Sequence, residues 1–251
     1  MGTSERIISS YNKNTEVWRR TKNTAHENLE KPAMYRKLPE LRGKDVLCIG
    51  CGTGEECAYI KGLGVKEVIG IDISERMIET SRKEDPSIEF KIMDMEELSF
   101  PEDSFDFIYS SLCLHYAEDW RKTLKGVNRI LKKNGKFLFS THNPIYWGAE
   151  VKRIYGNKIR MLGSMKKGKK KEVIGDYLKT RKINDTWGKT FKVTYYHKPF
   201  HKMINEIKDS GFEILSCDEP SPLRSLKGID PWLFNYYRKI PPFIIFELGN
   251  S

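Results

Sequence analysis

Three glycines at alternate positions are the most informative residues for chemistry in this chain. An apolar segment over residues 46–49 runs into Gly50-x-Gly52-x-Gly54, and a helical pattern follows. A glycine turn at such a junction lets the backbone approach a ligand closely and points the free N–H groups of a helix N-terminus toward it. Because glycines also serve plain strand-to-helix turns, a second feature is needed to indicate a ligand.

An acidic residue supplies that feature. Asp72 ends the next apolar run, 18 residues after Gly54, where a carboxylate can accept hydrogen bonds from both hydroxyls of a ribose. The dinucleotide fingerprint requires glycine three residues after its second glycine, whereas this chain has Glu55 there, followed by Glu56. Two carboxylates would repel a pyrophosphate. The pattern therefore disfavours NAD and favours a ligand with a ribose and no phosphate.

Short apolar runs alternate with helical patterns between residues 44 and 142, which is typical of βαβ units and a parallel sheet. The runs are nearly continuously apolar, as expected of strands that are covered on both faces. Five strands are predicted here, and two more near the C-terminus, at residues 45–49, 67–71, 88–93, 105–110, 136–141, 212–217 and 243–248.

Helical stripes of apolar residues lie between these runs. Ser74 is predicted to cap a helix that carries Met77. The stripe over residues 120–131 is expected to close at Asn134-Gly135, and a stripe that begins at Phe200 is expected to end at Gly211.

The length suits one domain with an insertion. Residues 1–43 read as polar helices that form a lid, and residues 44–142 as the ligand-binding core. Residues 143–198 read as an insertion after the fifth strand, with a basic run and a β-like stretch over 186–197, and residues 199–251 as a helix and the last strands. The predicted fold class is α/β: a Rossmann-like, seven-stranded, mostly parallel sheet with helices on both faces.

Four motifs, in this order along the chain, resemble the class I S-adenosylmethionine-dependent methyltransferases. They most resemble the small-molecule enzymes of that family with ubiquinone-biosynthesis-like motifs. The motifs are the glycine turn, Ile71-Asp72-Ile73, Met93-Asp94-Met95, and residues 105–111 with Leu114-His115. The resemblance covers about residues 43–142 well and the C-terminal strands more loosely. It implies S-adenosylmethionine as the cofactor and S-adenosylhomocysteine as its product.

The resemblance also implies roles for individual residues of the core. The turn would wrap the methionine part of the cofactor through Gly50, Cys51, Gly52, Thr53 and Gly54. Asp72 would hold the ribose, and Ile73 and Met77 would pack against the adenine. Asp94 would accept a hydrogen bond from the adenine amino group, and the Met95 backbone would contact the adenine ring. Ser111 would face the methionine end of the cofactor. Structural alternatives stay open for four of them: caps or turn residues for Asp72 and Asp94, a core-edge hydroxyl for Ser111 and a core side chain for Met77.

One position departs from the family pattern. The family usually has an acid two residues before the first glycine, and this chain has Cys48 there. That acid helps to orient the amino-acid end of the cofactor. The resemblance therefore implies either weaker cofactor binding or a contact supplied from elsewhere.

The residues on the acceptor side are less sharply defined. Methyl transfer is an in-line displacement that needs alignment, and a general base only where the acceptor must lose a proton. His115 and His142 follow the fourth and fifth predicted strands and are candidate bases, with ordinary structural histidines as the alternative. A second set is predicted to line an acceptor pocket, or else to pack beneath a lid: Tyr11, Trp18, Tyr146, Trp147, Tyr195, Tyr196 and His197.

The net charge of +10, from 44 basic and 34 acidic residues, belongs to one segment. Nine cations and no acid lie between Val151 and Lys171, so the rest of the chain has 35 basic and 34 acidic residues. A solvated loop is expected for this basic run. Gating of an anionic acceptor, and binding of RNA or another polyanion, are the alternatives.

The cysteines and the N-terminal residues indicate the cellular compartment in which the protein is expected. Five cysteines, mostly beside apolar residues, are typical of reduced thiols in a cytoplasm. Cys48, Cys51 and Cys57 lie close together, but a buried strand and a glycine turn hold the first two, so no metal is expected. Residues 1–14 lack the apolar stretch of a signal peptide, and no run approaches the roughly 18–20 apolar residues of a membrane span. A cytoplasmic protein without a membrane partner is therefore predicted.

The sequence thus predicts methyl transfer from S-adenosylmethionine to oxygen, nitrogen or carbon of a small-molecule acceptor. Two alternatives stay open. One is an RNA methyltransferase that uses the basic insertion. The other is a cofactor-binding protein without turnover, which Cys48 and the lack of an obvious base suggest.

Overall fold

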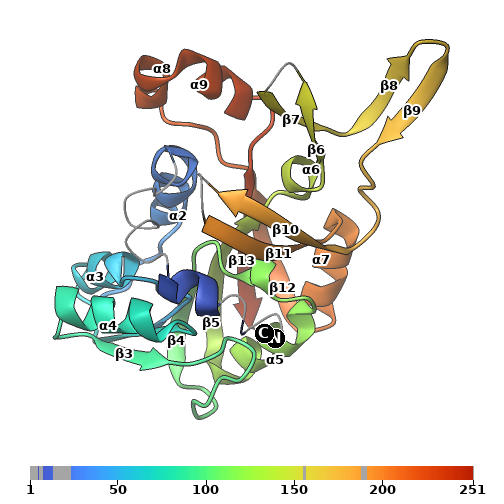
Figure 1. The fold of residues 1–251 in the computed structure, drawn as a ribbon. Coiled ribbons are helices and arrows are strands. Elements are labelled where there is room, and N and C mark those ends of the chain that lie inside the picture. The colour runs from blue at the N-terminus through green and yellow to red at the C-terminus, as the bar shows by residue number, and fades with distance from the viewer. Residues whose placement is uncertain (1–4, 6–7, 14–23, 155–156, 188–190, 251) are drawn as a thin grey trace.

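The computed structural model describes residues 5, 8–13, 24–154, 157–187 and 191–250. Within these residues, seven strands form one sheet in the order β12-β13-β5-β4-β1-β2-β3 (Figure 1). The strands are β1 (Asp45–Ile49), β2 (Glu67–Asp72), β3 (Glu89–Ile92), β4 (Phe105–Ser110), β5 (Leu131–His142), β12 (Phe212–Asp218) and β13 (Phe243–Asn250). Adjacent pairs from β5 to β3 are parallel, and β13 is antiparallel to both of its neighbours. The predicted seven-stranded, mostly parallel sheet is confirmed.

Helices cover both faces of the sheet, because side chains alternate along each buried strand. On one face, Val46 and Cys48 of β1 pack against α2 (Lys31–Arg36), α3 (Glu55–Lys61) and α4 (Glu75–Glu84). On the other face, Leu47 and Ile49 join a core with α5 (Trp120–Ile130) and α7 (Phe200–Lys208). Figure 1 shows the two groups of helices on opposite sides of the sheet.

Helix α5 ends earlier than predicted. It stops at Ile130, and the chain enters β5 at Leu131, which pairs with Phe105 in β4. The expectation that Asn134-Gly135 closes this helix is wrong, because an apolar Leu131 satisfies a helical stripe and a strand equally well. Asn134 instead adopts a left-handed backbone, with φ of 63°, inside the strand. The predicted cap of α4 is confirmed, since Ser74 Oγ accepts a hydrogen bond of 3.2 Å from Met77 N.

The insertion is richer in strands than predicted. It begins with α6 (Pro144–Trp147), where Asn143 caps the helix and Pro144 opens it. Three antiparallel hairpins follow: β6 (Glu150–Ile154) with β7 (Asn157–Met161), β8 (Gly163–Lys167) with β9 (Lys170–Ile174), and β10 (Arg181–Trp187) with β11 (Phe191–His197). The β-like stretch expected over 186–197 falls on two strands, the end of β10 and the whole of β11, which pair antiparallel with Trp187 opposite Phe191.

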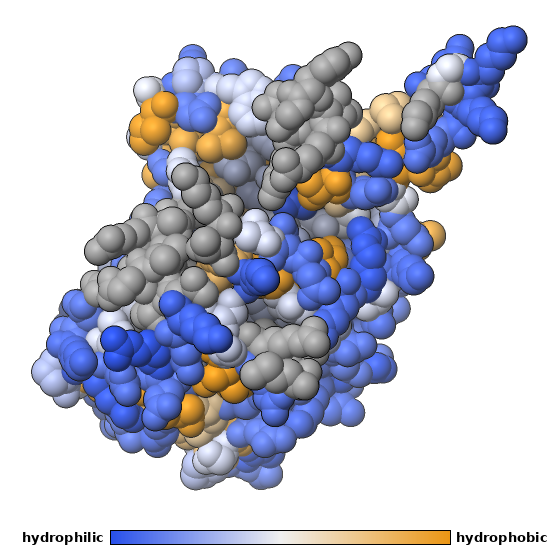
Figure 2. All heavy atoms as spheres, in the orientation of Figure 1, coloured by the Kyte–Doolittle hydropathy of each residue, from blue (hydrophilic) through white to orange (hydrophobic). Residues whose placement is uncertain are grey.

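The basic run forms the tip of the β8–β9 hairpin. Gly168, with φ of +63°, turns the chain, and Lys166 lies opposite Lys171 in the register. The hairpin projects away from the sheet in Figure 1, and Figure 2 shows its tip covered by hydrophilic residues. The expected solvated loop is therefore a solvated hairpin.

Two short helices near the C-terminus were not predicted. They are α8 (Ser225–Ile229) and α9 (Pro231–Tyr237), which fall between the last two strands of the chain. Leu223 N donates a hydrogen bond of 2.8 Å to Asn28 O. This bond ties the segment to the π-helical turn η1 (His26–Glu30) that precedes α2.

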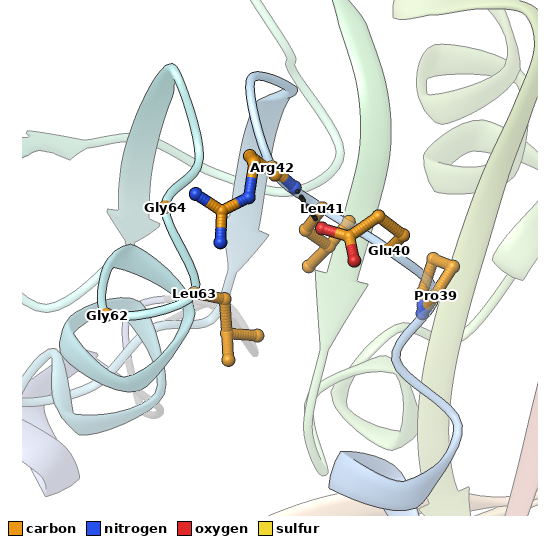
Figure 3. Close-up of a pocket in the computed structure, with 7 residues that line it drawn as sticks. All are labelled: Pro39, Glu40, Leu41, Arg42, Gly62, Leu63 and Gly64. Atoms are coloured by element: carbon orange, nitrogen blue, oxygen red, sulfur yellow. Dashed lines mark hydrogen bonds between the residues drawn. The ribbon is translucent and has the colours of Figure 1, made fainter.

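A surface groove lies at the amino edge of the sheet, on the loops that precede β1 and β2. Its lining residues are Pro39, Glu40, Leu41, Arg42, Gly62, Leu63 and Gly64 (Figure 3). Arg42 N donates a hydrogen bond of 3.0 Å to Glu40 Oε1 across its rim. The glycine turn follows β1 at the opposite, carboxyl edge, so this groove is not part of that site. No helix formed by the described residues is long and apolar enough to cross a membrane.

Candidate active site

The glycine turn between β1 and α3 has the backbone that its sequence demands. Gly50, Gly52 and Gly54 have φ values of +68°, +52° and +84°, in the left-handed region that favours glycine. A Cβ atom at Gly50 would lie 2.5 Å from Cys113 Sγ, and one at Gly54 would lie 2.8 Å from Phe90 Cζ. Conformation therefore disfavours larger residues at all three positions, and lack of space disfavours them also at Gly50 and Gly54.

Asp72 faces this turn from the end of β2. Its Oδ2 accepts a hydrogen bond of 3.0 Å from Gly52 N, and its Oδ1 accepts one of 2.9 Å from Ser74 N. Burial raises the pKa of Asp72 in spite of these hydrogen bonds. Each carboxylate oxygen keeps a further lone pair, so the pair of oxygens fits the two hydroxyls of a ribose.

The third predicted motif lies beside Asp72. Met93 N donates a hydrogen bond of 3.0 Å to Asp72 O, and Asp94 Oδ1 accepts one of 2.9 Å from Glu96 N. Met95 contacts Cys113, with 3.5 Å between the two sulfur atoms. Asp94 and Met95 thus adjoin the turn through Asp72 and Cys113. In α4, Met77 is buried with 1% of its surface exposed, whereas Ile73 before that helix is half-buried.

Ser111 contacts a residue that the sequence did not single out. Its Oγ donates a hydrogen bond of 2.9 Å to Glu30 Oε1, and Ser140 Oγ donates to the same oxygen. The other oxygen, Oε2, lies 3.2 Å from His26 Nε2. Glu30 is fully buried. It belongs to a polar N-terminal segment in which no spacing or motif marks it.

Residues 8–13 form a helical segment over the carboxyl edge of the sheet. Asn12 Oδ1 accepts a hydrogen bond of 2.6 Å from Ser74 Oγ and one of 3.3 Å from Arg76 N. The Tyr11 hydroxyl contacts the hydroxyl of Tyr116, which ends the short helix η2 (Leu114–Tyr116) after β4. The N-terminal segment therefore joins α4 to η2 beside Asp72. Trp18, the other aromatic residue predicted here, lies outside the described residues.

The two candidate bases stack face to face. The rings of His115 and His142 lie 3.6 Å apart at an angle of 9°, and Trp147 stacks on the far side of His142 at 3.9 Å. Tyr195 meets His142 edge-on at 4.8 Å. The Arg160 guanidinium lies 4.4 Å from the centre of the Trp147 ring. The tertiary structure thus joins residues from η2, β5, α6, β7 and β11 in one stack.

Burial keeps the imidazoles of this stack neutral. It lowers the pKa of His115 to about 3 and that of His142 well below its ordinary value, with further lowering of the His142 pKa by His115 and the Arg160 cation. Both ring nitrogens of His115 are buried and make no hydrogen bond to any described residue. Near neutral pH this ring can therefore offer one nitrogen as an acceptor and one N–H as a donor.

This low pKa predicts a stability loss in mild acid. Below the ordinary histidine pKa of 6.5, the unfolded chain takes up a proton at His115 that the folded chain refuses until about pH 3. Between about pH 7.5 and about pH 5.5, the wild type should lose about 1.4 kcal/mol more unfolding free energy than His115→Phe, which keeps a flat ring and cannot titrate. Urea denaturation at both pH values measures the difference. Equal losses in the two proteins would contradict a neutral, buried His115.

Only part of the predicted acceptor set comes together. Tyr11, Tyr146, Trp147 and Tyr195 belong to one aromatic cluster that also contains residues of α8 and α9. Tyr196 follows Tyr195 on β11, so its side chain lies on the opposite face of the strand. His197 Nε2 lies 2.8 Å from Tyr177 O, inside the insertion. Arg160 and Tyr116, which the sequence did not single out, also contact this cluster.

All five cysteines are free, and three are buried beside the turn: Cys48, Cys51 and Cys57. Among the residues that the structure describes, no three side chains of histidine, cysteine, aspartate or glutamate are grouped in a way that suits a metal ion.

Known proteins resemble this chain in sequence and in fold. A family model described as a methyltransferase domain matches residues 47–139, from β1 through most of β5. An uncharacterized protein of Haemophilus influenzae is 31% identical, over 86% of this chain and 89% of that protein. The crystal structure of an S-adenosylmethionine-dependent methyltransferase from Mesorhizobium loti matches at 29% identity with a TM-score of 0.72, over 88% of this chain and 97% of that one.

Other curated relatives match mainly over the core. The demethylmenaquinone methyltransferase of Staphylococcus aureus is 37% identical over 99 residues, which are 38% of this chain and 41% of that enzyme. An uncharacterized methyltransferase of Bacillus subtilis is matched over 53% of its length. The chain thus spans about half, or less, of these relatives. With the glycine turn, Asp72 and the seven-stranded sheet in place, the chain belongs to the class I S-adenosylmethionine-dependent methyltransferases and is an enzyme that uses S-adenosylmethionine.

Proposed function

We propose that this enzyme methylates an oxygen, nitrogen or carbon atom of a small-molecule acceptor. The observation that carries the proposal is the buried aromatic cluster over the carboxyl edge of the sheet, to which residues 8–13, α6, β11 and α9 all contribute. Aromatic side chains that these elements bring together suit contact with a small molecule better than with a folded polymer. Acceptor-facing roles are proposed for Tyr11, Tyr146, Trp147 and Tyr195.

The cofactor is proposed to lie along the glycine turn. Asp72 would bind the ribose, with Ile73 and Met77 near the adenine, Asp94 and Met95 at its polar edge, and Ser111 toward the methionine end. When bound, S-adenosylmethionine supplies a methyl group on a sulfonium that is open to in-line displacement. The chain's part is to orient the acceptor and to exclude water, which residues 8–13 support by their contacts with α4 and β11.

His115 and His142 are proposed to face the acceptor. Their neutral form accepts a hydrogen bond, which suits an acceptor that must lose a proton. The low pKa of His115 makes it a weak base, so its main effect would be to orient the acceptor hydroxyl or amine. If His115→Phe retains the full kcat on the identified acceptor, this role is excluded.

The relatives support small-molecule methylation as a class and leave the acceptor open. The Staphylococcus aureus enzyme is named for methylation of demethylmenaquinone. The matched family model ends at residue 139, before the insertion that carries the aromatic residues. Membership of an enzyme family also disfavours the alternative of cofactor binding without turnover. The free, largely buried cysteines support a reducing compartment, and we propose the cytoplasm.

The exposed lysines of the β8–β9 hairpin favour RNA as a second candidate acceptor. The hairpin points away from the sheet (Figure 1), so its lysines do not line the proposed acceptor space. A polyanion held there would have to bend back to reach the glycine turn.

One labelling experiment separates the two candidates. The enzyme is incubated with S-adenosylmethionine that carries a labelled methyl group and with a cell extract, which is then divided into small molecules and total RNA. Label is expected in the small-molecule fraction and should persist when Lys166, Lys169, Lys170 and Lys171 are replaced by serine. Label in RNA that disappears in this variant would establish the second candidate and overturn the first.

A further inference from the structure

The missing acid at Cys48 raises the question of what binds the cationic amino group of the cofactor. We infer that Glu30 provides the carboxylate that binds this α-ammonium group, in place of the acid that the family usually carries two residues before the first glycine. The inference rests on the proposed position of the cofactor along the glycine turn.

Glu30 lies on the face of the sheet to which Cys48 belongs. Cys48 in β1 and Tyr109 in β4 are register partners, and both pack on the side covered by α2. Glu30 directly precedes α2, and its hydrogen bonds reach Ser111, just past the end of β4. The Glu30 carboxylate therefore comes from the segment before α2 and lies at the carboxyl edge of β4. This strand is the neighbour of β1, in which Cys48 replaces the usual acid.

The hydrogen-bonding capacity of Glu30 is only partly used. Oε1 accepts from Ser111 and Ser140, but Oε2 accepts no hydrogen bond from the described residues and only lies near His26. The Tyr109 hydroxyl on the same face is also buried without a hydrogen-bond partner among the residues described. Buried polar atoms in native proteins are nearly always paired, so a ligand donor at this place accounts for both.

The charge of Glu30 leads to the same conclusion. A buried carboxylate is unfavourable unless a cation pairs with it, and burial accordingly raises the pKa of Glu30. The basic side chain beside Glu30 is that of His26, and two carboxylates share it, because His26 Nε2 also lies 3.8 Å from Glu56 Oε1. An α-ammonium group would bring a full positive charge and several N–H donors, whereas the carboxylate of the same amino-acid end would be repelled.

Two ligands test the inference by calorimetry: S-adenosylhomocysteine and an analogue in which hydrogen replaces its α-amino group. The wild type is expected to bind S-adenosylhomocysteine roughly 10- to 100-fold more tightly than the analogue. In Glu30→Gln this preference should fall to about twofold or less, through loss of affinity for S-adenosylhomocysteine alone. Equal losses for both ligands, or an unchanged preference, would overturn the inference.

Matched variants keep the outcome interpretable. Glu27→Gln, in the same turn but with a half-exposed side chain that pairs with Lys31, should keep the wild-type preference. If Glu30→Gln does not fold, Glu30→Asp keeps the charge on a shorter side chain and should weaken the preference only in part. A Glu30→Asp protein with the full wild-type preference would count against the inference. Failure of the proposed cofactor position is recognised separately, because Asp72→Asn would then leave binding of both ligands intact.

Discussion

Asp72→Asn is expected to weaken the binding of S-adenosylhomocysteine by about 100-fold, which corresponds to about 3 kcal/mol. Both Asp72 oxygens already accept backbone hydrogen bonds, from Gly52 and Ser74. Asparagine removes the charge and turns one acceptor into a donor, so a ribose hydroxyl loses a charged partner worth about 1.5–3 kcal/mol. The amide also faces a backbone N–H with its own N–H group. Titration calorimetry with S-adenosylhomocysteine measures the loss.

The matched control for this variant is Asp103→Asn. Asp103 is exposed in the turn before β4, at the opposite edge of the sheet, and its left-handed backbone, with φ of 51°, suits asparagine equally well. Its binding constant should stay within about twofold of the wild type. An Asp72→Asn protein that is folded and binds S-adenosylhomocysteine normally would remove the basis of the proposed cofactor position.

Glu206→Ala is expected to reduce the free energy of unfolding by about 3–5 kcal/mol. Glu206 in α7 pairs with Lys198 at 2.8 Å, and both side chains are nearly fully buried, with 3% and 2% of their surface exposed. Burial lowers the pKa of Lys198 even beside this carboxylate. Glu206 Oε2 also accepts a hydrogen bond of 3.0 Å from Trp120 N at the start of α5. Removal of the carboxylate leaves a buried ammonium without its partner.

Denaturation in urea of three further variants tests this explanation. Lys198→Met should be destabilised to a similar extent as Glu206→Ala. The double variant Lys198→Met/Glu206→Leu should lose much less than the sum of the single losses, because no unpaired charge remains. Lys202→Met removes a half-exposed cation 3.9 Å from the same carboxylate and should change stability by less than about 1 kcal/mol. Additive losses in the double variant would contradict a coupled pair. Because Lys198 follows β11, this pair fastens the insertion to the core.

The cofactor side was predictable because its determinants are local. The glycine positions need backbone angles that other residues avoid, and Asp72 ends a strand whose neighbours are set by consecutive βαβ units. Strand limits were predicted to within a few residues for the same reason: a buried strand reads as an apolar run. The start of β5 at Leu131 could not be predicted in this way, because it depends on the pairing of Leu131 with Phe105, 26 residues earlier.

The acceptor side was only partly predictable. The sequence marked His115, His142, Trp147 and Tyr195 as candidates, but it carried no information that they stack in one group. That arrangement depends on how α6 and the β10–β11 hairpin fold back over the sheet. The alternation along β11, which separates Tyr195 from Tyr196, becomes visible only once the strand limits are known.

The amino-acid sequence by itself determined the fold class, the glycine turn and the acid that faces it, because each follows from backbone geometry within short stretches of chain. Only the tertiary structure decided what surrounds them. Glu30 comes within hydrogen-bonding distance of Ser111, 81 residues later, through packing of the N-terminal helices on the sheet. The His115 pKa depends on burial by segments distant in sequence. Such long-range contacts arise when whole helices and strands pack together. Residue types and their spacing along the chain do not reveal which distant residues this packing brings into contact.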